Sequence, residues 1–342
     1  MNVWIVVVNY NGWEDTRLCL ESLTKSTIPA RVVLVDNGSI DNQCAQFARE
    51  FPRIDVVRNE ENGGWAGGNN TGICRALKHG ADQIVLLNND TTVSPKLVES
   101  LIGAARANSE FGILGPVICF MDEPDTVMTD GCVFNHPNRS GFFQRQQIAL
   151  SVPSRVEEVE IVNGCCMMVS AAVIRTIGLI DESFFLVHEE SDLCLRARES
   201  GFRCGIIGEA LVWHKGSSSF ERTGRRAQRY YDARNLYLLL DKHIDRLPQG
   251  RNRVSSMAAY LRYVYHRWCI EYENGNVAAA DAVVAGLCDA LAGNFGPRTN
   301  QSHWGHLLMR GFFQTLHLIT AGRAATAKDS KHSPATVASS DN

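Results

Sequence analysis

The chain has 342 residues, of which 45% are hydrophobic and 21% are charged, and its formal net charge is −3. That length fits one large domain or two smaller ones, and the near-neutral charge excludes the global basic field that would attract nucleic acid. The eleven cysteines form no CxxC pair, and no window reaches the roughly 18–20 apolar residues that span a bilayer. We therefore expect a cytoplasmic globular protein with reduced thiols and no nucleic-acid partner.

The first 118 residues alternate between short apolar segments and amphipathic ones. The predicted strands are Val3–Val8, Arg31–Val35, Ile54–Val57 and Ile84–Leu87. The predicted helices are Asp15–Leu23, Asn42–Phe51, Thr71–His79 and Pro95–Asn108. Between them, 62–70 is so rich in glycine that we expect a loop, which would allow a ligand to approach the backbone closely. The alternation is typical of a mostly parallel sheet covered by helices.

Beyond residue 118 the pattern becomes mixed. Residues 122–155 are polar and predict a hairpin or flexible loops around Gly141. Further strands are expected at 160–169 and 206–213. Helices are expected within 181–201, after an acidic cluster, and then at 225–240, 253–292 and 307–319. The residues from about 324 onward are rich in Ala, Ser, Thr and Lys, which predicts a disordered tail.

Polar side chains follow three predicted strands at the point where each strand ends. They are Asn9-Tyr10-Asn11, Asp36-Asn37 and Asn88-Asn89-Asp90. Because parallel α/β sheets bind ligands beyond the carboxyl ends of their strands, we expect one polar site that suits a nucleotide and a metal. Asp36 could accept hydrogen bonds from a base or ribose, or it could only cap a turn. Asp90 could bind Mg²⁺ or Mn²⁺, or it could only turn the chain.

An acidic cluster follows the apolar segment Phe184–Val187, and it contains Glu189, Glu190 and Asp192. Acidic residues in the first turn of a helix favour its dipole, which is a purely structural explanation. Neighbouring like charges and partial burial can also raise a carboxyl pKa and create a general base. Asp192 stands four residues before Arg196 and is better explained as an ion-pair partner. Glu189 and Glu190 remain as candidates for the base.

His214 follows the apolar strand predicted at 206–213. A neutral imidazole suits Mn²⁺, although a lone histidine is more often a packing residue. Basic side chains crowd just after it and could bind a diphosphate or an anionic acceptor, or could form a solvated helix face. These residues are Lys215, Arg222, Arg225, Arg226 and Arg229.

The order of these motifs resembles that of the family-2 inverting glycosyltransferases with the GT-A fold. The likeness is greatest to the rhamnosyltransferase-type branch that acts on bacterial surface polysaccharides, and it covers about residues 1–240. The segments that carry it are Val8–Gly12, Val35–Ser39, Asn59–Gly72, Leu87–Asp90, Asn163–Met167, Glu189–Arg196 and Val212–His214.

The resemblance implies an α/β fold of the GT-A (Rossmann-like) type, a mostly parallel sheet covered by helices, with a C-terminal helical extension. It makes 1–224 the catalytic domain, with a nucleotide-sugar half at about 1–118 and an acceptor half at about 119–224. A helical region would follow at 225–323, and the disordered tail at 324–342.

The resemblance also implies roles for individual residues. The donor-binding residues would be Asn9, Tyr10, Asn11, Asp36, Asn37, Asn69, Asn70, Asn88, Asn89 and Asp90. Asp90 and His214 would hold the divalent metal, Mg²⁺ or Mn²⁺. The Glu-Asp pair of the family falls on Glu189-Glu190, so Glu190 takes the position of the base, with Glu189 and Asp192 as alternatives. Residues 220–230 could close as a lid over the bound donor.

The implied activity is transfer of a sugar, with rhamnose as one candidate, from a dTDP-, UDP- or GDP-linked donor to a saccharide or lipid-linked acceptor. The segment 307–319 either packs in the core or touches the inner face of the membrane where such an acceptor resides. A nucleotidyltransferase is the nearest rival enzyme, but the segment after the first strand is acidic rather than basic. A non-catalytic sugar-nucleotide or polysaccharide-binding protein is the other alternative. The sequence leaves the oligomeric state open.

Overall fold

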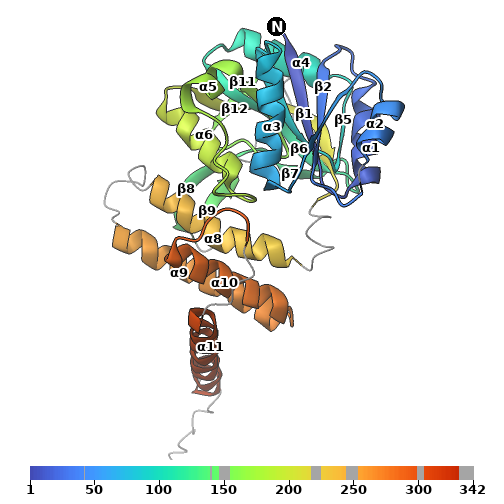
Figure 1. Cartoon of the computed structure of the whole chain (residues 1–342). Helices are drawn as coiled ribbons and strands as arrows, with labels where there is room; N and C mark the ends of the chain where they lie inside the picture. The colour runs from blue at the N-terminus through green and yellow to red at the C-terminus, as the bar shows by residue number, and fades with distance from the viewer. Residues whose placement is uncertain are drawn as a thin grey trace, which may run out of the picture.

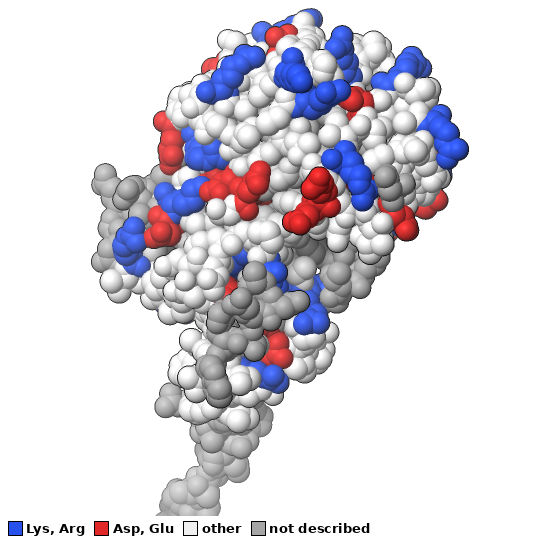
Figure 2. Space-filling view, in the orientation of Figure 1, with Lys and Arg blue, Asp and Glu red and all other residues white. Residues whose placement is uncertain are grey.

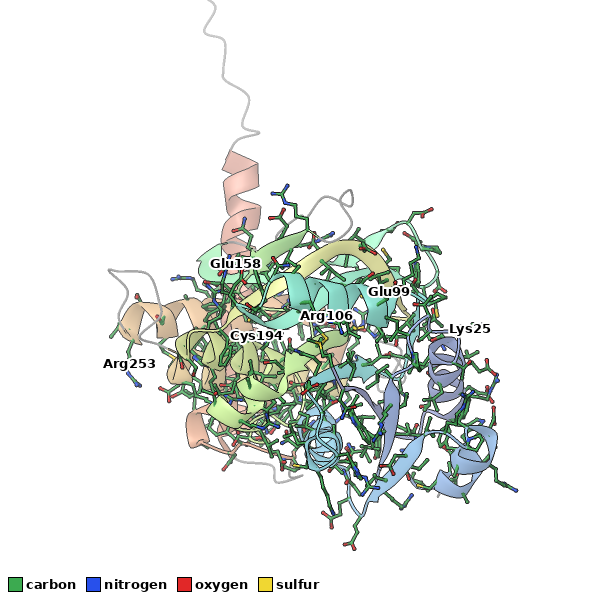
Figure 3. The ribbon with its side chains drawn as sticks, turned by 90° about the horizontal axis from the view of Figure 1, so that it is seen from above. Lys25, Glu99, Arg106, Glu158, Cys194 and Arg253 are labelled. Carbon is green, nitrogen blue, oxygen red and sulfur yellow. The ribbon has the colours of Figure 1, made fainter. Side chains whose placement is uncertain are left out.

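The computed structural model describes residues 1–41, 43–138, 141–145, 155–216, 225–243, 253–298 and 304–330. Figure 1 shows an α/β body that holds the N-terminus, a group of helices packed below it, and one last helix that points away from both. The view from above in Figure 3 agrees, with the last helix again projecting from the body and Cys194 inside it. All eleven cysteines lie in described segments and are free thiols.

A ten-stranded mixed sheet forms the centre of the α/β body. Its strands are β1 (Val3–Asn9), β2 (Arg31–Asn37), β3 (Asp55–Asn59), β4 (Gln83–Asn88), β5 (Thr91–Val93), β6 (Phe111–Phe120), β7 (Val127–Thr129), β10 (Val156–Val159), β11 (Cys166–Ser170) and β12 (Arg203–His214). The order is β10-β12-β6-β11-β4-β1-β2-β3, with β5 on β12 and β7 on β6. Strands β4, β1, β2 and β3 are parallel neighbours, so their carboxyl ends meet at one edge. The predicted α/β architecture is confirmed.

Helices cover both faces of this sheet because its central strands are apolar at every position. On β1, Ile5 and Val7 belong to one core cluster, and Trp4 and Val6 belong to the other. The first face is covered by α1 (Trp13–Leu23), α2 (Cys44–Glu50) and α4 (Leu97–Ala107), and the second by α3 (Gly64–Lys78), α5 (Ala171–Ile177) and α6 (Glu189–Glu199). The sequence of a strand that is buried on both faces is a continuous apolar run, as it is over Val3–Val8 of β1.

The predicted loop at 62–70 is wrong, because α3 already begins at Gly64. The glycines allow this helix to lie directly on β1. A Cβ added at Gly72 would lie 2.2 Å from Val6 Cγ1, and one added at Gly68 would lie 2.6 Å from Val8 Cγ1. Glycine in this segment therefore marks close packing of a helix on a strand, and it costs about 1 kcal/mol of helix propensity per residue.

The strand predicted at 160–169 is also partly wrong, because only Cys166–Ser170 forms β11. Before it, the side chain of Asn163 accepts a hydrogen bond from the Cys165 amide at 2.9 Å, which turns the chain. The hairpin predicted around Gly141 is confirmed as β8 (Cys132–Asn138) paired with β9 (Gly141–Arg145).

After β12, the described part of the chain contains α8 (Arg226–Lys242), α9 (Arg253–Glu273), α10 (Val277–Ala292) and α11 (Trp304–Ser330). Tyr260 and Trp268 of α9 are buried in the core that these helices share. Helix α11 extends beyond the predicted end at Ile319 and into the segment predicted as a disordered tail, of which 331–342 lie outside the described residues. In the described part of the chain, no helix meets the length and hydropathy needed to cross a membrane.

Acidic and basic side chains are interspersed on the face of the α/β body shown in Figure 2. This agrees with the small net charge of −3. An extended basic surface, which nucleic acid would require, is not visible on the described residues of this face.

Candidate active site

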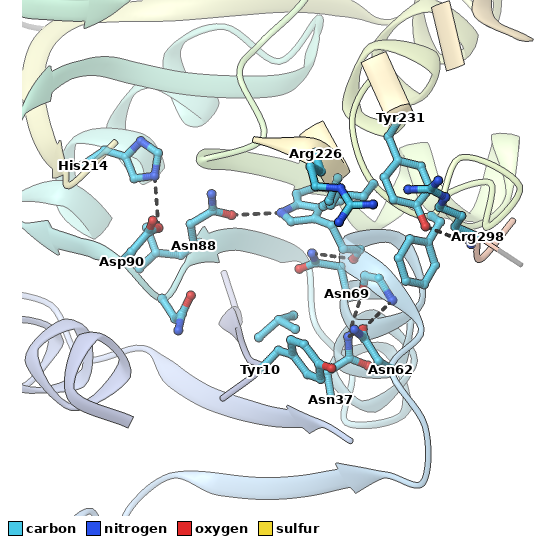
Figure 4. Close-up of a pocket in the computed structure, with 18 residues that line it drawn as sticks. Tyr10, Asn37, Asn62, Asn69, Asn88, Asp90, His214, Arg226, Tyr231 and Arg298 are labelled. Carbon is cyan, nitrogen blue, oxygen red and sulfur yellow. Dashed lines mark hydrogen bonds and ion pairs between the residues drawn. The ribbon is translucent and has the colours of Figure 1, made fainter. Parts of the chain in front are cut away.

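A cavity of about 640 Å³ opens at the carboxyl ends of β1, β2 and β4 (Figure 4). Seven of the predicted site residues line it: Tyr10, Asn37, Asn69, Asn88, Asn89, Asp90 and His214. They come from β2, β4, β12, α3 and the turns after β1 and β4, so the sheet topology brings together side chains that are far apart in sequence. Figure 4 shows Asp90 and His214 at one end of the cavity, and Tyr231 and Arg298 at the other.

Asp90 and His214 lie beside each other at one end of this cavity. Asp90 precedes β5, and the pairing of Thr91 with His214 on β12 fixes the two side chains beside each other. His214 Nε2 lies 3.0 Å from Asp90 Oδ1, and both side chains are largely buried, with 14% and 11% exposed. One carboxylate and one imidazole suit Mg²⁺ or Mn²⁺ when phosphate oxygens and water complete the shell.

Asn69 on α3 offers a polar atom to the cavity. Its Nδ2 donates to the Trp65 carbonyl at 2.9 Å. Its Oδ1 is buried and has no hydrogen-bond partner among the described residues. A buried acceptor without a partner is costly, so this oxygen is suited to a hydroxyl or N–H group of a ligand. The indole of Trp65 in turn donates to Asn88 Oδ1 at 2.9 Å and keeps that amide oriented.

Four predicted donor-site residues do not line the cavity. Asp36 is fully buried, pairs with Arg58, and accepts from Asn9 Nδ2 at 3.2 Å. Asn11 has a positive φ of 52° and accepts from the Ile40 amide. Asn70 bonds to the backbone of Ile180 on both sides of its amide. These side chains shape the loops around the cavity through internal hydrogen bonds.

The three carboxylates in the first turn of α6 have different surroundings. Glu189 is buried, and burial together with the charge of Glu190 raises the pKa of Glu189 well above its ordinary value. Burial would also raise the pKa of Asp192, but the hydrogen bond from His243 and the charges of Arg196 and Lys242 lower it to about 2. Asp192 is therefore an ionised structural partner, and Glu189 favours the protonated form.

Glu190 faces a second cavity of about 190 Å³, which Asn163, His188 and Ser191 also line. This cavity lies next to the larger one across Gly164. A Cβ added at Gly164 would be 3.2 Å from both Glu190 Cβ and Trp65 Cζ2, and Trp65 lines the larger cavity. Glu190 lines this smaller cavity, whereas Glu189 and Asp192 line neither of the two cavities.

The predicted basic cluster separates in the structure. Arg226 lines the larger cavity, whereas Lys215 pairs with Asp15 at 2.9 Å and Arg229 with Glu271 at 2.6 Å. Arg225 precedes α8, and Arg222 lies outside the described residues, as do 220–224 of the predicted lid.

Sequence reasoning missed three groups of the cavity wall. They are Trp65, whose segment we expected to be a loop, Tyr231 of α8, and Arg298 in the segment after α10. The aromatic character of 225–240 was a signal for Tyr231, but nothing local to Arg298 indicates that the chain returns to the cavity.

The family model described as glycosyl transferase family 2 matches residues 4–177, which is half of the chain. A low-salt glycan biosynthesis hexosyltransferase, Agl10 of Haloferax volcanii, is 27% identical over 71% of this chain and 78% of its own. The dTDP-rhamnosyl transferase RfbF of Shigella flexneri is 26% identical over 75% and 86%. An N-acetylglucosaminyl-diphospho-decaprenol L-rhamnosyltransferase of Mycobacterium tuberculosis is 25% identical over 70% and 84%.

The fold is also similar to that of a solved structure, GalNAc-T7 with UDP, GalNAc and Mn²⁺. The TM-score is 0.51 and the sequence identity is 16%, and the match covers 62% of this chain and 43% of that one. At this identity the likeness concerns the fold alone.

Proposed function

Because this chain belongs to glycosyl transferase family 2, we propose that it transfers a sugar from a nucleoside-diphosphate donor to an acceptor hydroxyl in glycan biosynthesis. One observation carries the proposal. Polar side chains from the ends of parallel strands line one cavity with Asp90 and His214, and Glu190 faces a second cavity next to it. A donor site and an acceptor site of this kind must adjoin for direct transfer.

Rhamnose is the sugar that we propose, and dTDP is the nucleotide that we expect first. The support comes from relatives named for rhamnosyl transfer, one of them from a dTDP-linked donor. UDP- and GDP-linked hexoses are the other candidates, because a further relative is named only as a hexosyltransferase. A non-catalytic binding protein and a nucleotidyltransferase are not favoured by these relatives.

The larger cavity has the groups that a nucleoside-diphosphate sugar needs. Asn69 Oδ1 is available to accept a hydrogen bond, and Arg226 and Arg298 can face phosphate oxygens. Asp90 and His214 would hold a divalent cation, and such a cation offsets the negative charge of a departing diphosphate. Mn²⁺ accepts the imidazole more readily than Mg²⁺ does, so we expect it to support binding better.

Glu190 is the general base in this proposal. The acceptor hydroxyl lies in the smaller cavity, where the carboxylate takes its proton as the oxygen bonds to the anomeric carbon of the donor sugar. The bond from that carbon to the diphosphate breaks on the opposite face, and its electron pair leaves with the nucleoside diphosphate. One displacement inverts the anomeric centre. The product glycoside, the nucleoside diphosphate and protonated Glu190 account for all atoms.

We further propose peripheral contact with a membrane that carries a lipid-linked acceptor. Five large apolar side chains of α11 are exposed: Leu307, Leu308, Phe312, Leu318 and Ile319. They share one side of the helix, whereas Phe313 on the opposite side is buried against α9 and α10. A helix with one charge-free apolar face fits the boundary between headgroups and acyl chains. One relative is named for a decaprenol-linked acceptor.

A thermal-shift and calorimetric screen tests the donor site. Purified protein is mixed with dTDP, UDP or GDP, each with Mn²⁺, with Mg²⁺ or without metal. We expect one nucleotide to raise the melting temperature only when metal is present, because a ligand that binds the folded state stabilises it by about 2.7 kcal/mol at 100 times its Kd.

Asp90→Asn should remove the metal dependence of that shift. Asp125→Asn, which changes an exposed carboxylate between β6 and β7, is the matched control and should leave it intact. Failure of all three nucleotides to bind would contradict the proposed donor site.

A further inference from the structure

The segment that leads into the base helix has an unusual backbone. Phe185, Val187 and His188 have positive φ angles of 61°, 72° and 74°. L-residues other than Gly, Asn and Asp rarely adopt this region, and a β-branched residue such as Val187 is a clear outlier. His188 is the residue directly before α6, so the conformation of this segment sets where Glu190 points.

Asn235 of α8 holds this segment through its side-chain amide. Its Nδ2 lies 2.8 Å from the carbonyl oxygen of Phe184, 2.7 Å from that of Leu186 and 2.8 Å from that of Val187. Asn235 is fully buried, so these bonds form away from water. An ordinary turn does not direct three carbonyl groups from four consecutive residues to one nitrogen, and the positive φ angles make that convergence possible.

Arg234, the preceding residue, orients this amide and binds the same segment. Its Nε donates to Asn235 Oδ1 at 2.8 Å, which fixes the Nδ2 side toward the carbonyl groups. Its Nη2 donates to the carbonyl oxygens of Ser183 at 3.2 Å and Phe184 at 3.0 Å. Arg234 is 1% exposed, so these backbone carbonyl groups replace water as the hydrogen-bond partners of its guanidinium.

The same guanidinium also holds a part of the donor-cavity wall. Its Nη1 donates to the Gly296 carbonyl at 2.6 Å, and its plane stacks 4.8 Å from the ring centre of Tyr231. The Tyr231 hydroxyl accepts from the Arg298 amide at 3.0 Å. Tyr231 and Arg298 both line the larger cavity (Figure 4).

We propose that Arg234 and Asn235 are positioning residues that connect the two cavities. Asn235 holds 184–187 in its strained form and so places Glu190, whereas Arg234 holds both that segment and the 296–298 segment that carries Arg298. This proposal rests on the proposed function, in which Glu190 is the base. It makes α8, which lies beyond the matched residues 4–177, a required part of the active site.

Two variants test the roles of Asn235 and Arg234 separately. Asn235→Ala should lower kcat by about 100-fold, since a shift of about 1 Å in a catalytic group costs that much. It should weaken the affinity for the nucleoside diphosphate less than Arg234→Lys does, by under about tenfold, although Phe185 and Leu186 of the held segment also line the larger cavity. Arg234→Lys should lower kcat similarly and also weaken nucleotide binding by about tenfold. Lysine lacks the planar guanidinium that donates to carbonyl groups of both segments at once.

Leu236→Ala is the matched control on the same helix. Leu236 is buried in the core of the C-terminal helices, away from 183–188. Its truncation should lower the melting temperature without changing kcat or nucleotide affinity by more than about threefold, measured below the transition. If Asn235→Ala behaved like Leu236→Ala, the positioning role would be overturned.

A rescue variant tests the mechanism directly. Glycine adopts positive φ without strain, so Val187→Gly in the Asn235→Ala background should recover part of the lost kcat. No recovery would contradict the claim that Asn235 acts through the backbone of this segment.

Hydrogen exchange at the amides of 183–188 measures how firmly Asn235 holds this segment, and it needs no substrate. It should rise in Asn235→Ala and not in Leu236→Ala. A wild-type protein that bound no nucleotide would thus overturn the proposed function, while unchanged exchange in Asn235→Ala would overturn this inference alone.

Discussion

Three carboxylates within four positions of α6 differ in what surrounds them. Asp192 has three cationic or hydrogen-bonding partners, Glu189 has a buried oxygen without a partner among the described residues, and Glu190 faces a cavity. The environment therefore favours the protonated form of Glu189 and the ionised form of Asp192, and it places Glu190 where a ligand can reach it. From the sequence, Asp192 could be recognised as an ion-pair partner by its spacing to Arg196, but the burial that separates Glu189 from Glu190 depends on tertiary packing.

The lowered pKa of Asp192 predicts that the stability of the protein depends on pH. Its pKa of about 2 in the folded protein lies below the ordinary 3.8. The ionised form is therefore favoured by folding, and its contribution is present above about pH 4 and is lost as the pH falls toward 2. Asp192→Asn should flatten this slope and lower the free energy of unfolding at pH 7 by about 3 kcal/mol, because Arg196, Lys242 and His243 each lose one charged partner.

Urea unfolding at a series of pH values measures this effect. Asp241→Asn is the control, because Asp241 forms an exposed ion pair with Arg253 that should contribute less than about 1 kcal/mol. Equal losses in the two variants would contradict the assignment of Asp192 as a buried structural partner.

Helix α3 shows where reasoning from the sequence succeeded and where it did not. Apolar runs and polar strand ends were sufficient to predict β1, β2 and β4 and the side chains that follow them. The glycine content of 62–70 indicated a loop, because local propensity takes no account of tertiary packing. In the structure α3 packs so closely on β1 that a Cβ added at Gly72 would lie 2.2 Å from Val6 Cγ1. The contributions of Tyr231 and Arg298 were missed for the same reason, since they depend on where the C-terminal helices pack.

Gly72 gives an element-level prediction. Alanine normally stabilises a helix by about 1 kcal/mol relative to glycine. At Gly72 the added methyl group would meet Val6, so Gly72→Ala should destabilise the protein by about 1–3 kcal/mol and weaken nucleotide binding through displacement of Asn69.

Gly103→Ala on α4 is the matched comparison, because a Cβ there meets nothing within 4 Å. It should raise the melting temperature and leave nucleotide binding unchanged. A stabilising Gly72→Ala would contradict the close packing of α3 on β1.

At the scale of the whole molecule, the donor cavity is built by two parts of the chain. The strand ends supply the polar floor, and α8 and the segment after α10 supply Arg226, Tyr231 and Arg298. Residues from both sides of the boundary that we predicted near residue 225 therefore line one cavity. Helix α11 projects from this assembly with its apolar side exposed (Figures 1 and 3).

The proposed membrane contact predicts a specific loss of lipid binding. Leu308 is 76% exposed on α11, and Leu291 is 52% exposed on α10. Leu308→Ser should reduce sedimentation with anionic phospholipid vesicles by about tenfold, as expected when one leucine side chain no longer enters the bilayer. Leu291→Ser should not. Equal binding of the two variants, or a dimer that depends on Leu308 without vesicle binding, would contradict contact through α11.

The measurement that tests the central claim most directly is sugar transfer by Glu190→Gln and Glu189→Gln, side by side with wild type. The donor is dTDP-rhamnose, with UDP- and GDP-hexoses as further donors, and the acceptor is a prenyl-diphosphate-linked N-acetylglucosamine. We predict that Glu190→Gln keeps nucleotide affinity within about threefold and loses transfer by at least about 100-fold, as expected for a general base. Glu189→Gln should retain both. Transfer by Glu190→Gln, with loss in Glu189→Gln or Asp192→Asn, would contradict the account.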